Sequence, residues 1–340
     1  MEIKFDNKKT HVYMGDAWDL TKKLLSGKDV IIISDINVNK LYGYSFPDYP
    51  VITIGTGEAV KELDTVKTII KHLIAIGADR SSFLLGIGGG VVCDITGFVA
   101  SVFMRGIDFG FISTTLLSQV DASIGGKNGV NVNGIKNIIG CIKQPSFVIC
   151  DSGLLNTLPD EEYISGLGEL VKHALIKDKE LFRVIEDNIS PVLKRKPDLL
   201  EELISKSIVI KIAVVERDEM ELGERKLLNF GHTLGHAIES TTGLSHGISI
   251  ASGMMAAVEI SYNEGLINKK DVERIRSLFT NLGLLPEIKI RWPAIRDKIF
   301  SDKKRRGNNI SFILLEKIGH GIQKEYLLED ILKKLHKQFS

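Results

Sequence analysis

Two histidines lie four positions apart in a segment whose small and apolar neighbours predict a helix. His232 and His236 would share one helical face, where two imidazoles can bind a metal ion. His246 and the pair Glu169 and His173 add a carboxylate and further imidazoles. A His/His/Glu set with one open position is typical of catalytic zinc. The spacing predicts a metal site without selecting its ligands, and ordinary core or surface histidines remain the alternative.

The segment Gly86-Ile87-Gly88-Gly89-Gly90 follows an apolar segment. It precedes residues 91–103, which have the composition of a helix. The backbone N–H groups of such a loop, together with a helix N-terminus, can hold a pyrophosphate. The strict dinucleotide-binding fingerprint requires glycine at position 91, where this chain has valine. The run therefore indicates a nucleotide site, and close packing of strand against helix is the alternative.

Hydroxyl, carboxylate and ammonium groups are concentrated in a glycine-rich stretch between positions 113 and 137. They belong to Ser113, Thr114, Thr115, Asp121, Ser123, Lys127, Lys136 and Asn137. Such a density of polar groups favours a site that binds a polyol or a phosphate, with a solvated loop as the alternative.

Lys211, Arg225 and the basic run at 303–306 are the other notable cations. A basic run without interleaved aromatic residues usually forms a solvated face, and it is poor evidence for nucleic-acid binding. A substrate that carries both a carboxylate and a phosphate would nevertheless need several such cations.

The composition indicates a cytoplasmic globular protein. The 340 residues are 44% hydrophobic and 26% charged, and their net charge is +1. This balance excludes a general electrostatic attraction to nucleic acid or to an anionic membrane. The three cysteines form no C-x-x-C pair, which argues against a disulfide framework and a thiolate zinc site. The N-terminal residues do not resemble a signal peptide, and no apolar run approaches about 18 residues.

We expect two domains, residues 1–159 and 160–340. In the first, apolar runs at 30–33, 51–54 and 82–85 predict parallel strands, and the pattern at 58–76 predicts a helix that ends at Gly77. This alternation predicts a Rossmann-like α/β domain. In the second, helices are expected at 160–187, 198–217, 227–240, 247–265 and 269–282, with one late strand at 310–315. We expect the active site in a cleft between the two domains.

Ten motifs, in order along nearly the whole chain, resemble the 3-dehydroquinate synthase family. They are GIGGGVVCDITGFVAS, FMRGIDF, STTLLSQVDASIGGKNGVN, IKNIIG, QPSFVICD, TLP, GLGELVKHALI, ERKLLNFGHTLGHAIE, SHG and SDKKRRG. The resemblance implies an NAD- and zinc-dependent lyase, in which Co²⁺ can replace zinc. Its reaction would convert 3-deoxy-D-arabino-heptulosonate 7-phosphate into 3-dehydroquinate and phosphate, on the shikimate route to chorismate and the aromatic amino acids.

The resemblance also implies a role for each matched residue. The metal ligands would be Glu169, His232 and His246. The NAD contacts would be Asp35, Glu58, Lys61, Gly89, Gly90, Asp94, Thr114, Thr115, Lys136 and Thr157. The catalytic groups would be Lys127, Lys172, Glu221, Arg225 and His236, and the substrate contacts Arg105, Asp121, Asn137, Lys211, Asn229, Lys303 and Lys304. Among these, Lys211 and Arg225 would bind the carboxylate, while Lys127, Asn137, His236 and one of Lys303 and Lys304 would bind the phosphate.

The resemblance gives His236 a role in proton transfer or phosphate binding and makes the more distant His246 the third ligand. It further implies a homodimer, in which Arg105 reaches the site of a neighbouring subunit. Three positions depart from the family pattern, which often has threonine at Asn128, tyrosine at His173 and glutamate at Ile248. The last change could alter the surroundings of the metal.

Other functions remain to be separated from this one. A dehydrogenase of the glycerol dehydrogenase type would share the two-domain plan and the metal, but its substrates carry no paired carboxylate and phosphate. Another sugar phosphate cyclase is closer in chemistry, and a silent NAD- or zinc-binding module would not need the full set of matched groups.

Overall fold

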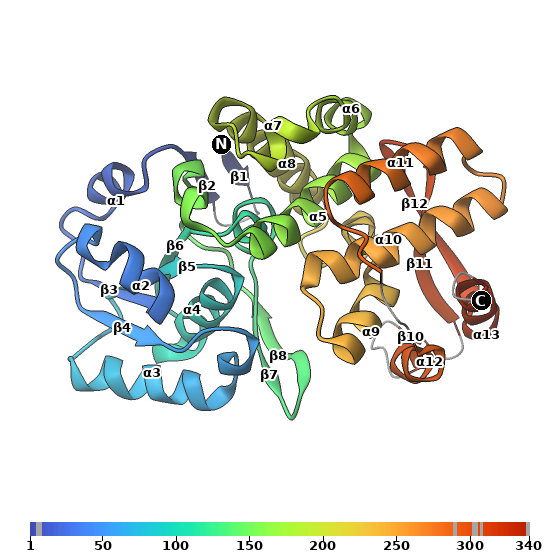
Figure 1. Ribbon diagram of the computed structural model, residues 1–340. Coiled ribbons are helices and arrows are strands. Elements are labelled where there is room, and N and C mark those ends of the chain that lie inside the picture. Colours follow the sequence, from blue (N-terminus) through green and yellow to red (C-terminus); the bar gives the residue numbers. More distant parts are fainter. Residues whose placement is uncertain (5–8, 288–290, 301–304, 307–308, 338–340) are drawn as a thin grey trace. The chain divides into compact units, whose positions relative to one another are not determined.

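The structure is a computed structural model that describes residues 1–4, 9–287, 291–300, 305–306 and 309–337 (Figure 1). The chain divides into two compact units, Met1–Leu158 and Pro159–Ser340. Two of the expected substrate contacts, Lys303 and Lys304, lie outside the described residues. Among the described residues, no helix is both long and apolar enough to cross a membrane.

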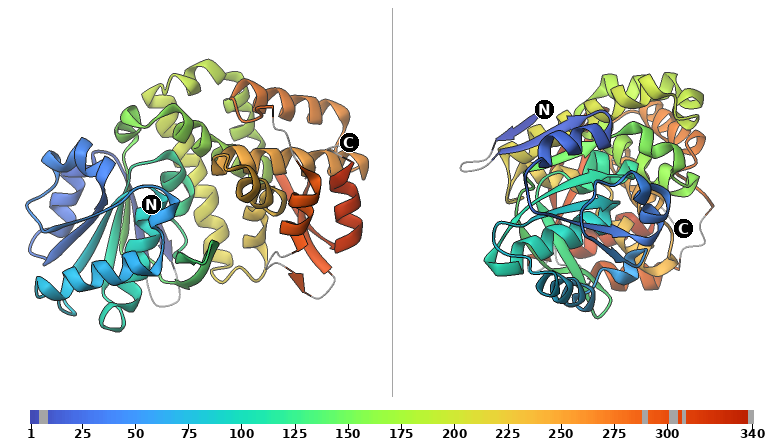
Figure 2. Two further views of the ribbon diagram at one scale, coloured as in Figure 1. Left: turned by 60° about the horizontal axis from the view of Figure 1, so that its bottom comes forward. Right: turned by 90° about the vertical axis from the view of Figure 1, so that its left-hand side faces the viewer.

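The first unit is built on a seven-stranded sheet with the order β1-β2-β9-β6-β5-β3-β4 (Figures 1 and 2). Its strands are β1 (Glu2–Lys4), β2 (Lys9–Met14), β3 (Val30–Asp35), β4 (Val51–Ile54), β5 (Phe83–Gly88), β6 (Asp108–Ser113) and β9 (Phe147–Cys150). Strand β1 runs antiparallel to β2, and all other neighbours are parallel. The expected parallel α/β domain is therefore confirmed.

Helices and short turns connect these strands. The helices are α1 (Ala17–Leu25), α2 (Ile36–Tyr42), α3 (Leu63–Ala75) and α4 (Gly90–Val102), with 3₁₀ turns η1 (Gly43–Ser45), η2 (Glu58–Val60), η3 (Phe103–Arg105) and η5 (Ser152–Thr157). A π-helical turn, η4 (Ser118–Ala122), precedes a separate two-stranded hairpin of β7 (Lys127–Val132) and β8 (Ile135–Ile142). The polar cluster at 113–137, for which a loop was the alternative, thus contains a regular hairpin.

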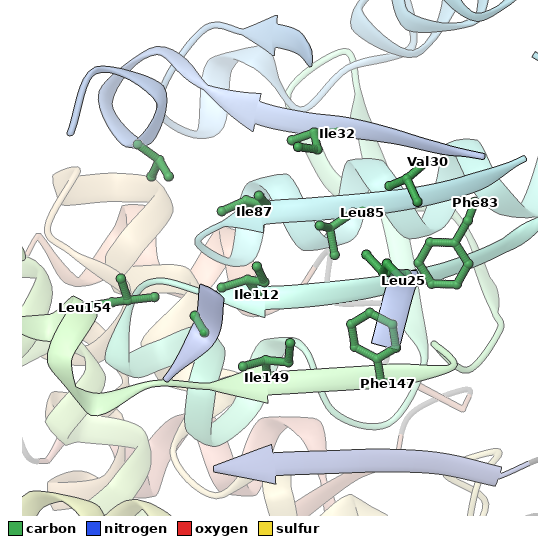
Figure 3. Close-up of a cluster of buried hydrophobic side chains, with 12 residues drawn as sticks. Leu25, Val30, Ile32, Phe83, Leu85, Ile87, Ile112, Phe147, Ile149 and Leu154 are labelled. Carbon is green, nitrogen blue, oxygen red and sulfur yellow. The ribbon is translucent and has the colours of Figure 1, made fainter. Parts of the chain in front are cut away.

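The sheet is held together by apolar residues from its central strands. On one face, Ile32 of β3, Ile87 of β5, Ile112 of β6 and Ile149 of β9 form a buried cluster with residues of α1 and α2 (Figure 3). Each fully buried aliphatic side chain of this kind contributes about 1.5–3 kcal/mol. Strands that are buried on both faces have nearly continuous apolar sequences. They could therefore be recognised although apolar and polar residues do not alternate along them.

The chain changes direction across the sheet between β3 and β5. Strand β4 pairs with one side of β3, and β5 pairs with the other. The connections that leave the carboxyl ends of β3 and β5 therefore diverge, and open parallel sheets bind their ligands at such a point.

The second unit is mainly helical. Its helices are α5 (Asp160–Lys177), α6 (Lys179–Asp187), α7 (Ile189–Leu193), α8 (Pro197–Arg217), α9 (His232–Thr242), α10 (His246–Asn263), α11 (Lys269–Asn281), α12 (Trp292–Phe300) and α13 (Leu328–His336). A 3₁₀ turn, η6 (Glu224–Asn229), precedes α9. The described strands β10 (Arg305–Arg306), β11 (Asn309–Lys317) and β12 (His320–Leu327) form a small antiparallel sheet.

Several expected helix boundaries were wrong. The helix expected at 160–187 is divided at Asp178, whose carboxylate accepts hydrogen bonds from the N–H groups of Glu180 and Leu181 and so begins α6. The helix expected at 227–240 is divided near Gly231, which has a φ of 78°. The 3₁₀ turn η6 ends before this residue, and α9 begins after it. The late strand is real, but it pairs with β12, which the sequence analysis missed.

Candidate functional site

Three helices of the second unit meet at glycines, and these contacts bring the candidate metal ligands together. A Cβ atom on Gly247 of α10 would lie 1.9 Å from the backbone oxygen of Ser165 in α5. A Cβ atom on Gly253 would lie 2.0 Å from the backbone oxygen of Gly231, just before α9. The Ser165 hydroxyl also accepts a hydrogen bond of 2.9 Å from the N–H of Gly247. Only glycine permits such close packing, so the start of α10 is held directly against α5 and α9.

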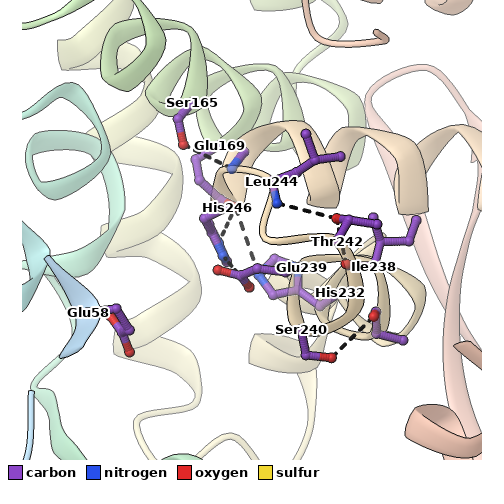
Figure 4. Close-up of polar contacts among 12 residues, drawn as sticks. Glu58, Ser165, Glu169, His232, Ile238, Glu239, Ser240, Thr242, Leu244 and His246 are labelled. Carbon is purple, nitrogen blue, oxygen red and sulfur yellow. Dashed lines mark hydrogen bonds and ion pairs between the residues drawn. The ribbon is translucent and has the colours of Figure 1, made fainter. Parts of the chain in front are cut away.

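Glu169, His232 and His246 converge at this junction (Figure 4). One carboxylate oxygen, Oε1 of Glu169, lies 3.4 Å from Nε2 of His246 and 3.8 Å from Nε2 of His232. Glu169 is fully buried and His232 is nearly so. Each residue offers one ligand atom within 4.8 Å of the others, which is a suitable set for a divalent metal ion.

The other ring nitrogens of both histidines have partners of their own. Nδ1 of His232 lies 3.1 Å from the backbone oxygen of Phe230, and Nδ1 of His246 lies 3.4 Å from Oε2 of Glu239. Such contacts orient each ring so that Nε2 faces the carboxylate. Burial disfavours the charged form of His246, but hydrogen bonds to Glu169 and Glu239 outweigh this effect and raise its pKa to about 9. Glu239 was missed in the sequence because no spacing connects it to Glu169.

His236 lies next to this cluster without belonging to the group around Glu169. Its ring centroid is 5.1 Å from that of His232 and 6.0 Å from that of His246. His236, Glu239 and His246 form a second group that could hold a metal ion, but His236 is exposed. The structure thus brings both of the histidine pairings considered from the sequence into one neighbourhood, and only the group with Glu169 has a buried carboxylate.

The second unit contains three buried cations among the expected site residues. The Lys172 ammonium forms an ion pair with Oε2 of Glu169, and the side chain of Lys172 is 1% exposed. Lys211 on α8 and Arg225 in η6 are also buried. Lysine and arginine are rarely buried unless they have anionic partners, and Glu169 is such a partner for Lys172.

The segment before α9 is held by hydrogen bonds among its own residues. The backbone N–H of Arg225 donates to Oδ2 of Asp218 at 3.0 Å, and Nη1 of Arg225 donates to the backbone oxygen of Glu219 at 2.5 Å. Nδ2 of Asn229 donates to Oε1 of Glu221 at 2.6 Å. Glu221 has a φ of 58°, a conformation that glycine adopts far more readily. These contacts hold Arg225 against Asp218 and Glu219, and Asn229 against Glu221.

In the first unit, the expected cofactor residues follow the carboxyl ends of neighbouring strands. Asp35 ends β3 and caps α2, because its Oδ1 accepts hydrogen bonds from the N–H groups of Asn37 and Val38. Gly89 precedes α4, and no side chain caps that helix. Thr114 follows β6, and its buried hydroxyl has no hydrogen-bond partner among the described residues. An uncapped helix N-terminus beside an unsatisfied hydroxyl is a suitable place for a phosphate group.

Two glycines at this edge let neighbouring side chains pack closely against the start of α4. A Cβ atom on Gly89 would lie 2.9 Å from Cγ2 of Thr115, and one on Gly90 would lie 3.2 Å from Cβ of Ala122. The strand, glycine run and helix expected around position 90 are therefore all present, as β5 and α4.

A second set of contacts connects η2 to α4 and to the β7–β8 hairpin. The Lys61 ammonium forms a largely buried ion pair with Asp94 of α4. Oε1 of Glu58 accepts a hydrogen bond of 2.8 Å from Nδ2 of Asn131, whose Oδ1 accepts one of 2.8 Å from the N–H of Asn137. Asn131 was not singled out in the sequence, since a lone asparagine in a strand carries no signal.

The remaining expected residues are placed as follows. Lys127 begins β7, Lys136 and Asn137 lie exposed in β8, and Asp121 lies in η4. The hydroxyl groups of Thr157 and Tyr42 are 2.5 Å apart. Arg105 is exposed at the end of η3 with a φ of 69°.

Comparison with known proteins gives the relatives of this chain. Residues 51–165 match the domain described as 3-dehydroquinate synthase N-terminal, and residues 166–305 match the domain described as 3-dehydroquinate synthase C-terminal. The 3-dehydroquinate synthase of Acetivibrio thermocellus is 40% identical over 323 residues, which cover 92% of this chain and 89% of the relative.

Two solved structures share the fold over its full length. A 2-deoxy-scyllo-inosose synthase, in complex with carbaglucose-6-phosphate, NAD⁺ and Co²⁺, has a TM-score of 0.89 and 27% identity over 99% of both chains. A 2-epi-5-epi-valiolone synthase from Streptomyces hygroscopicus, with NAD⁺ and Zn²⁺ bound, has a TM-score of 0.87 and 25% identity over 99% of this chain and 98% of that one. By sequence and by fold, the chain belongs to the 3-dehydroquinate synthase family.

Proposed function

We propose that this chain converts 3-deoxy-D-arabino-heptulosonate 7-phosphate into 3-dehydroquinate and phosphate, with NAD and zinc as cofactors. The observation that carries the proposal is the identity of about 40% with a curated 3-dehydroquinate synthase over 92% of the chain. The first unit would bind NAD, and the second would bind the metal ion and part of the substrate. The assigned reaction is that of a cyclising carbon–oxygen lyase.

The residues around Glu169 fit a zinc ion. One buried carboxylate and two imidazoles, each with its Nδ1 already engaged, supply three ligands and leave a fourth position for substrate oxygens. Glu169, His232 and His246 would hold the ion. When bound, zinc supplies a Lewis acid that lowers the pKa of an alcohol and stabilises negative charge.

The carboxyl edge of the first sheet fits a dinucleotide. The uncapped start of α4 and the buried hydroxyl of Thr114 are suited to its phosphates, and Asp35 at the end of β3 is suited to a ribose. When bound, NAD supplies a hydride acceptor that can return the hydride within the same catalytic cycle.

The reaction requires phosphate to leave from carbon 7, although the hydrogen on carbon 6 is not acidic in the alcohol. A ketone at carbon 5 makes that hydrogen acidic, so that its loss permits the phosphate to leave. The ketone must then be reduced before the ring opens and an intramolecular aldol reaction closes the carbocycle. The protein must therefore hold the carboxylate and phosphate ends of the substrate in place throughout these steps.

The cations of the chain suit this task. Lys211 and Arg225 are buried, so their charges are weakly screened and can bind the substrate carboxylate strongly. Lys127, Asn137 and His236 would bind the phosphate, whose own oxygens can accept the proton from carbon 6. Lys172 would remain paired with Glu169 and keep that carboxylate oriented.

We also propose that the working unit is a homodimer. The β8 strand exposes Ile135, Ile138, Ile139 and Ile142, and exposed apolar clusters of this kind usually mark interfaces. Arg105 lies in the same unit, beside the exposed Met104. In a symmetric dimer, each Arg105 would contribute to the site of the other chain.

Two experiments test the dimer. Ile139→Lys should shift the protein to monomers in sedimentation velocity, whereas Ile74→Lys, on the exposed face of α3, should not. Arg105→Ala and Lys211→Ala chains, each inactive alone, should regain part of the activity when co-assembled, since one mixed site then has both groups. Recovery that is absent in verified mixed dimers would contradict the shared site.

A cytoplasmic location completes the proposal. Its support is that Cys93, Cys141 and Cys150 are all free thiols, which suits a reducing compartment. Fractionation of cells, with antibody detection of the chain, tests the location.

The function itself is tested by phosphate release. With the heptulosonate phosphate, NAD and zinc, the protein should release phosphate and form 3-dehydroquinate, identified by mass spectrometry. Glucose 6-phosphate, which carries a phosphate but no carboxylate, should not react. Turnover of glucose 6-phosphate in place of the heptulosonate would favour another sugar phosphate cyclase.

A further inference from the structure

The loop between α4 and β6 has an unusual backbone. Three consecutive residues, Met104, Arg105 and Gly106, have φ values of 47°, 69° and 116°. Glycine adopts such angles readily, but a long side chain such as methionine or arginine costs on the order of 1–3 kcal/mol there. A backbone of this kind persists only where surrounding contacts hold it.

The contacts come from Lys143, which follows β8. Its ammonium donates hydrogen bonds to the backbone oxygens of Ile107 at 2.7 Å and of Ala100 at 3.1 Å. Ala100 lies in the last turn of α4, and Ile107 follows the loop, so one ammonium connects the two ends of the strained segment. A Cβ atom on Gly106 would lie 3.1 Å from this nitrogen, which is a tight contact.

Lys143 is itself fixed at the base of the β7–β8 hairpin. Its backbone N–H donates to the backbone oxygen of Gly126 at 2.9 Å, and its backbone oxygen accepts from Nδ2 of Asn128 at 2.9 Å. Asn128 fills the space beside Gly97 of α4, where a Cβ atom would lie 1.8 Å from its Oδ1. The hairpin, α4 and the strained loop are thus connected through one lysine.

We propose that Lys143 is a positioning residue, which holds the loop Met104–Gly106 in its left-handed conformation and so fixes Arg105 for binding the substrate phosphate. The proposal rests on the proposed function. The exposed guanidinium of Arg105 would otherwise lose conformational freedom on binding, and a fixed backbone reduces that loss. Lys143 acts through Arg105 and does not contact the reacting atoms.

The first test removes the two hydrogen bonds and measures the loop directly. Lys143→Met keeps most of the apolar stem but cannot donate. Hydrogen exchange of the peptide that spans residues 103–107 should accelerate in Lys143→Met. The N–H of Gly106 donates to the backbone oxygen of Phe103, and the N–H of Ile107 donates to that of Ala100 in α4, so both hydrogen bonds depend on the loop conformation. Lys143→Arg should restore protection, and Lys67→Met, an exposed lysine on α3, should leave it unchanged. Unchanged exchange in Lys143→Met would overturn the proposal, and this result does not depend on catalysis.

The second test uses kinetics of the zinc- and NAD-loaded enzyme. Lys143→Met should raise KM for the heptulosonate phosphate about tenfold with little change in kcat, as expected if the loop is competent about one tenth of the time. In the inactive Arg105→Ala background, Lys143→Met should have no additional effect on the Kd for the heptulosonate phosphate, measured by calorimetric titration. Met104→Gly should return the KM of Lys143→Met toward that of the parent, because glycine relieves the strain. Additive effects of Lys143→Met and Arg105→Ala would overturn the proposal, whereas an inactive parent enzyme would contradict only the proposed function.

Discussion

The two units bring their functional side chains together by different means. In the first unit, Asp35, Gly89 and Thr114 follow the carboxyl ends of parallel strands, so the topology of the sheet alone makes them neighbours. In the second unit, Glu169 and Lys172 lie within one buried helix and are stabilised by their own ion pair. The first arrangement depends on the order of the strands, and the second depends on close packing of helices around charges in an apolar environment.

Because of this difference, we expect substitutions in the first unit to change ligand affinity alone and substitutions in the second unit to change fold stability as well. A change at the edge of the first sheet should weaken ligand binding while the fold stays intact, because few buried charges are involved. A change among the buried charges of the second unit should affect metal binding and stability together, since the remaining partner keeps its charge in a poorly solvated place.

The largest effect is expected for Glu169→Gln. It removes the anionic ligand and leaves the buried Lys172 ammonium without that carboxylate. We expect metal content near zero after dialysis, and a loss of about 3 kcal/mol in the unfolding free energy of the metal-free protein. Elemental analysis and urea unfolding measure the two effects. Loss of metal with unchanged stability would contradict the role assigned to the buried pair.

The next effect separates the two histidine groups. His246→Ala should weaken zinc binding more than about 100-fold, and Glu239→Gln should weaken it by roughly 10–100-fold, because Glu239 only orients the ring of His246. His236→Ala should leave zinc affinity close to that of the parent. Competition with a chelator measures all three, and the reverse order of His246 and His236 would show that the exposed group is the metal site.

In the first unit, Gly89→Ala should lower NAD affinity about tenfold, because the added methyl group would lie 2.9 Å from Cγ2 of Thr115 and crowd the start of α4. Gly77→Ala is the matched control. Gly77 has a φ of 77° beyond the end of α3, with no atom within 4 Å of an added Cβ. It should lower stability by about 1 kcal/mol without changing NAD affinity. Calorimetric titration and urea unfolding distinguish the two outcomes.

The smallest effect concerns a charge cluster away from the metal group. Burial by itself raises the pKa of Glu264, but hydrogen bonds from Lys324, Tyr326 and Lys334 outweigh it and lower the pKa to about 2. The ionised carboxylate therefore stabilises the fold above its unfolded pKa of 4.5, and this contribution is lost as the pH falls from 4.5 to about 2.

Glu264→Gln should accordingly lower the unfolding free energy by about 2 kcal/mol at pH 7, with kcat and KM unchanged. The difference from the parent should shrink as the pH falls and vanish near pH 2. Chemical unfolding across this range provides the measurement, and a difference that is constant with pH would show that the ion pairs contribute nothing.

Strands β3, β4 and β5 and helix α4 could be predicted from the sequence, because buried parallel strands have apolar runs and Gly89 stands between one of them and a helix. The helix expected at 58–76 begins only at Leu63, and the other strands of the first unit were not recognised. The boundaries in the second unit were harder. Asp178 begins a new helix inside a pattern that remains helical on both sides, and β12 alternates too weakly to be recognised.

The metal ligands Glu169, His232 and His246 were also difficult to predict from the spacing of residues alone. Spacing favoured the pair His232 and His236, since periodicity reports only neighbours on one helix. Glu169 and His246 come from other helices, and they meet because Gly247 allows α10 to approach α5 closely. That contact has no signature in a single sequence, so only the family resemblance selected the group with Glu169.

The central claim is that NAD is used and restored within each cycle of a cyclase, and the ratio of phosphate to NADH tests it most directly. With limiting NAD, saturating zinc and excess heptulosonate phosphate, we predict many phosphates released per NAD, without accumulating absorbance at the wavelength of NADH. A substrate analogue without the phosphate leaving group should stall after oxidation. NADH formed in proportion to product during steady turnover would contradict the cyclase assignment and indicate a dehydrogenase.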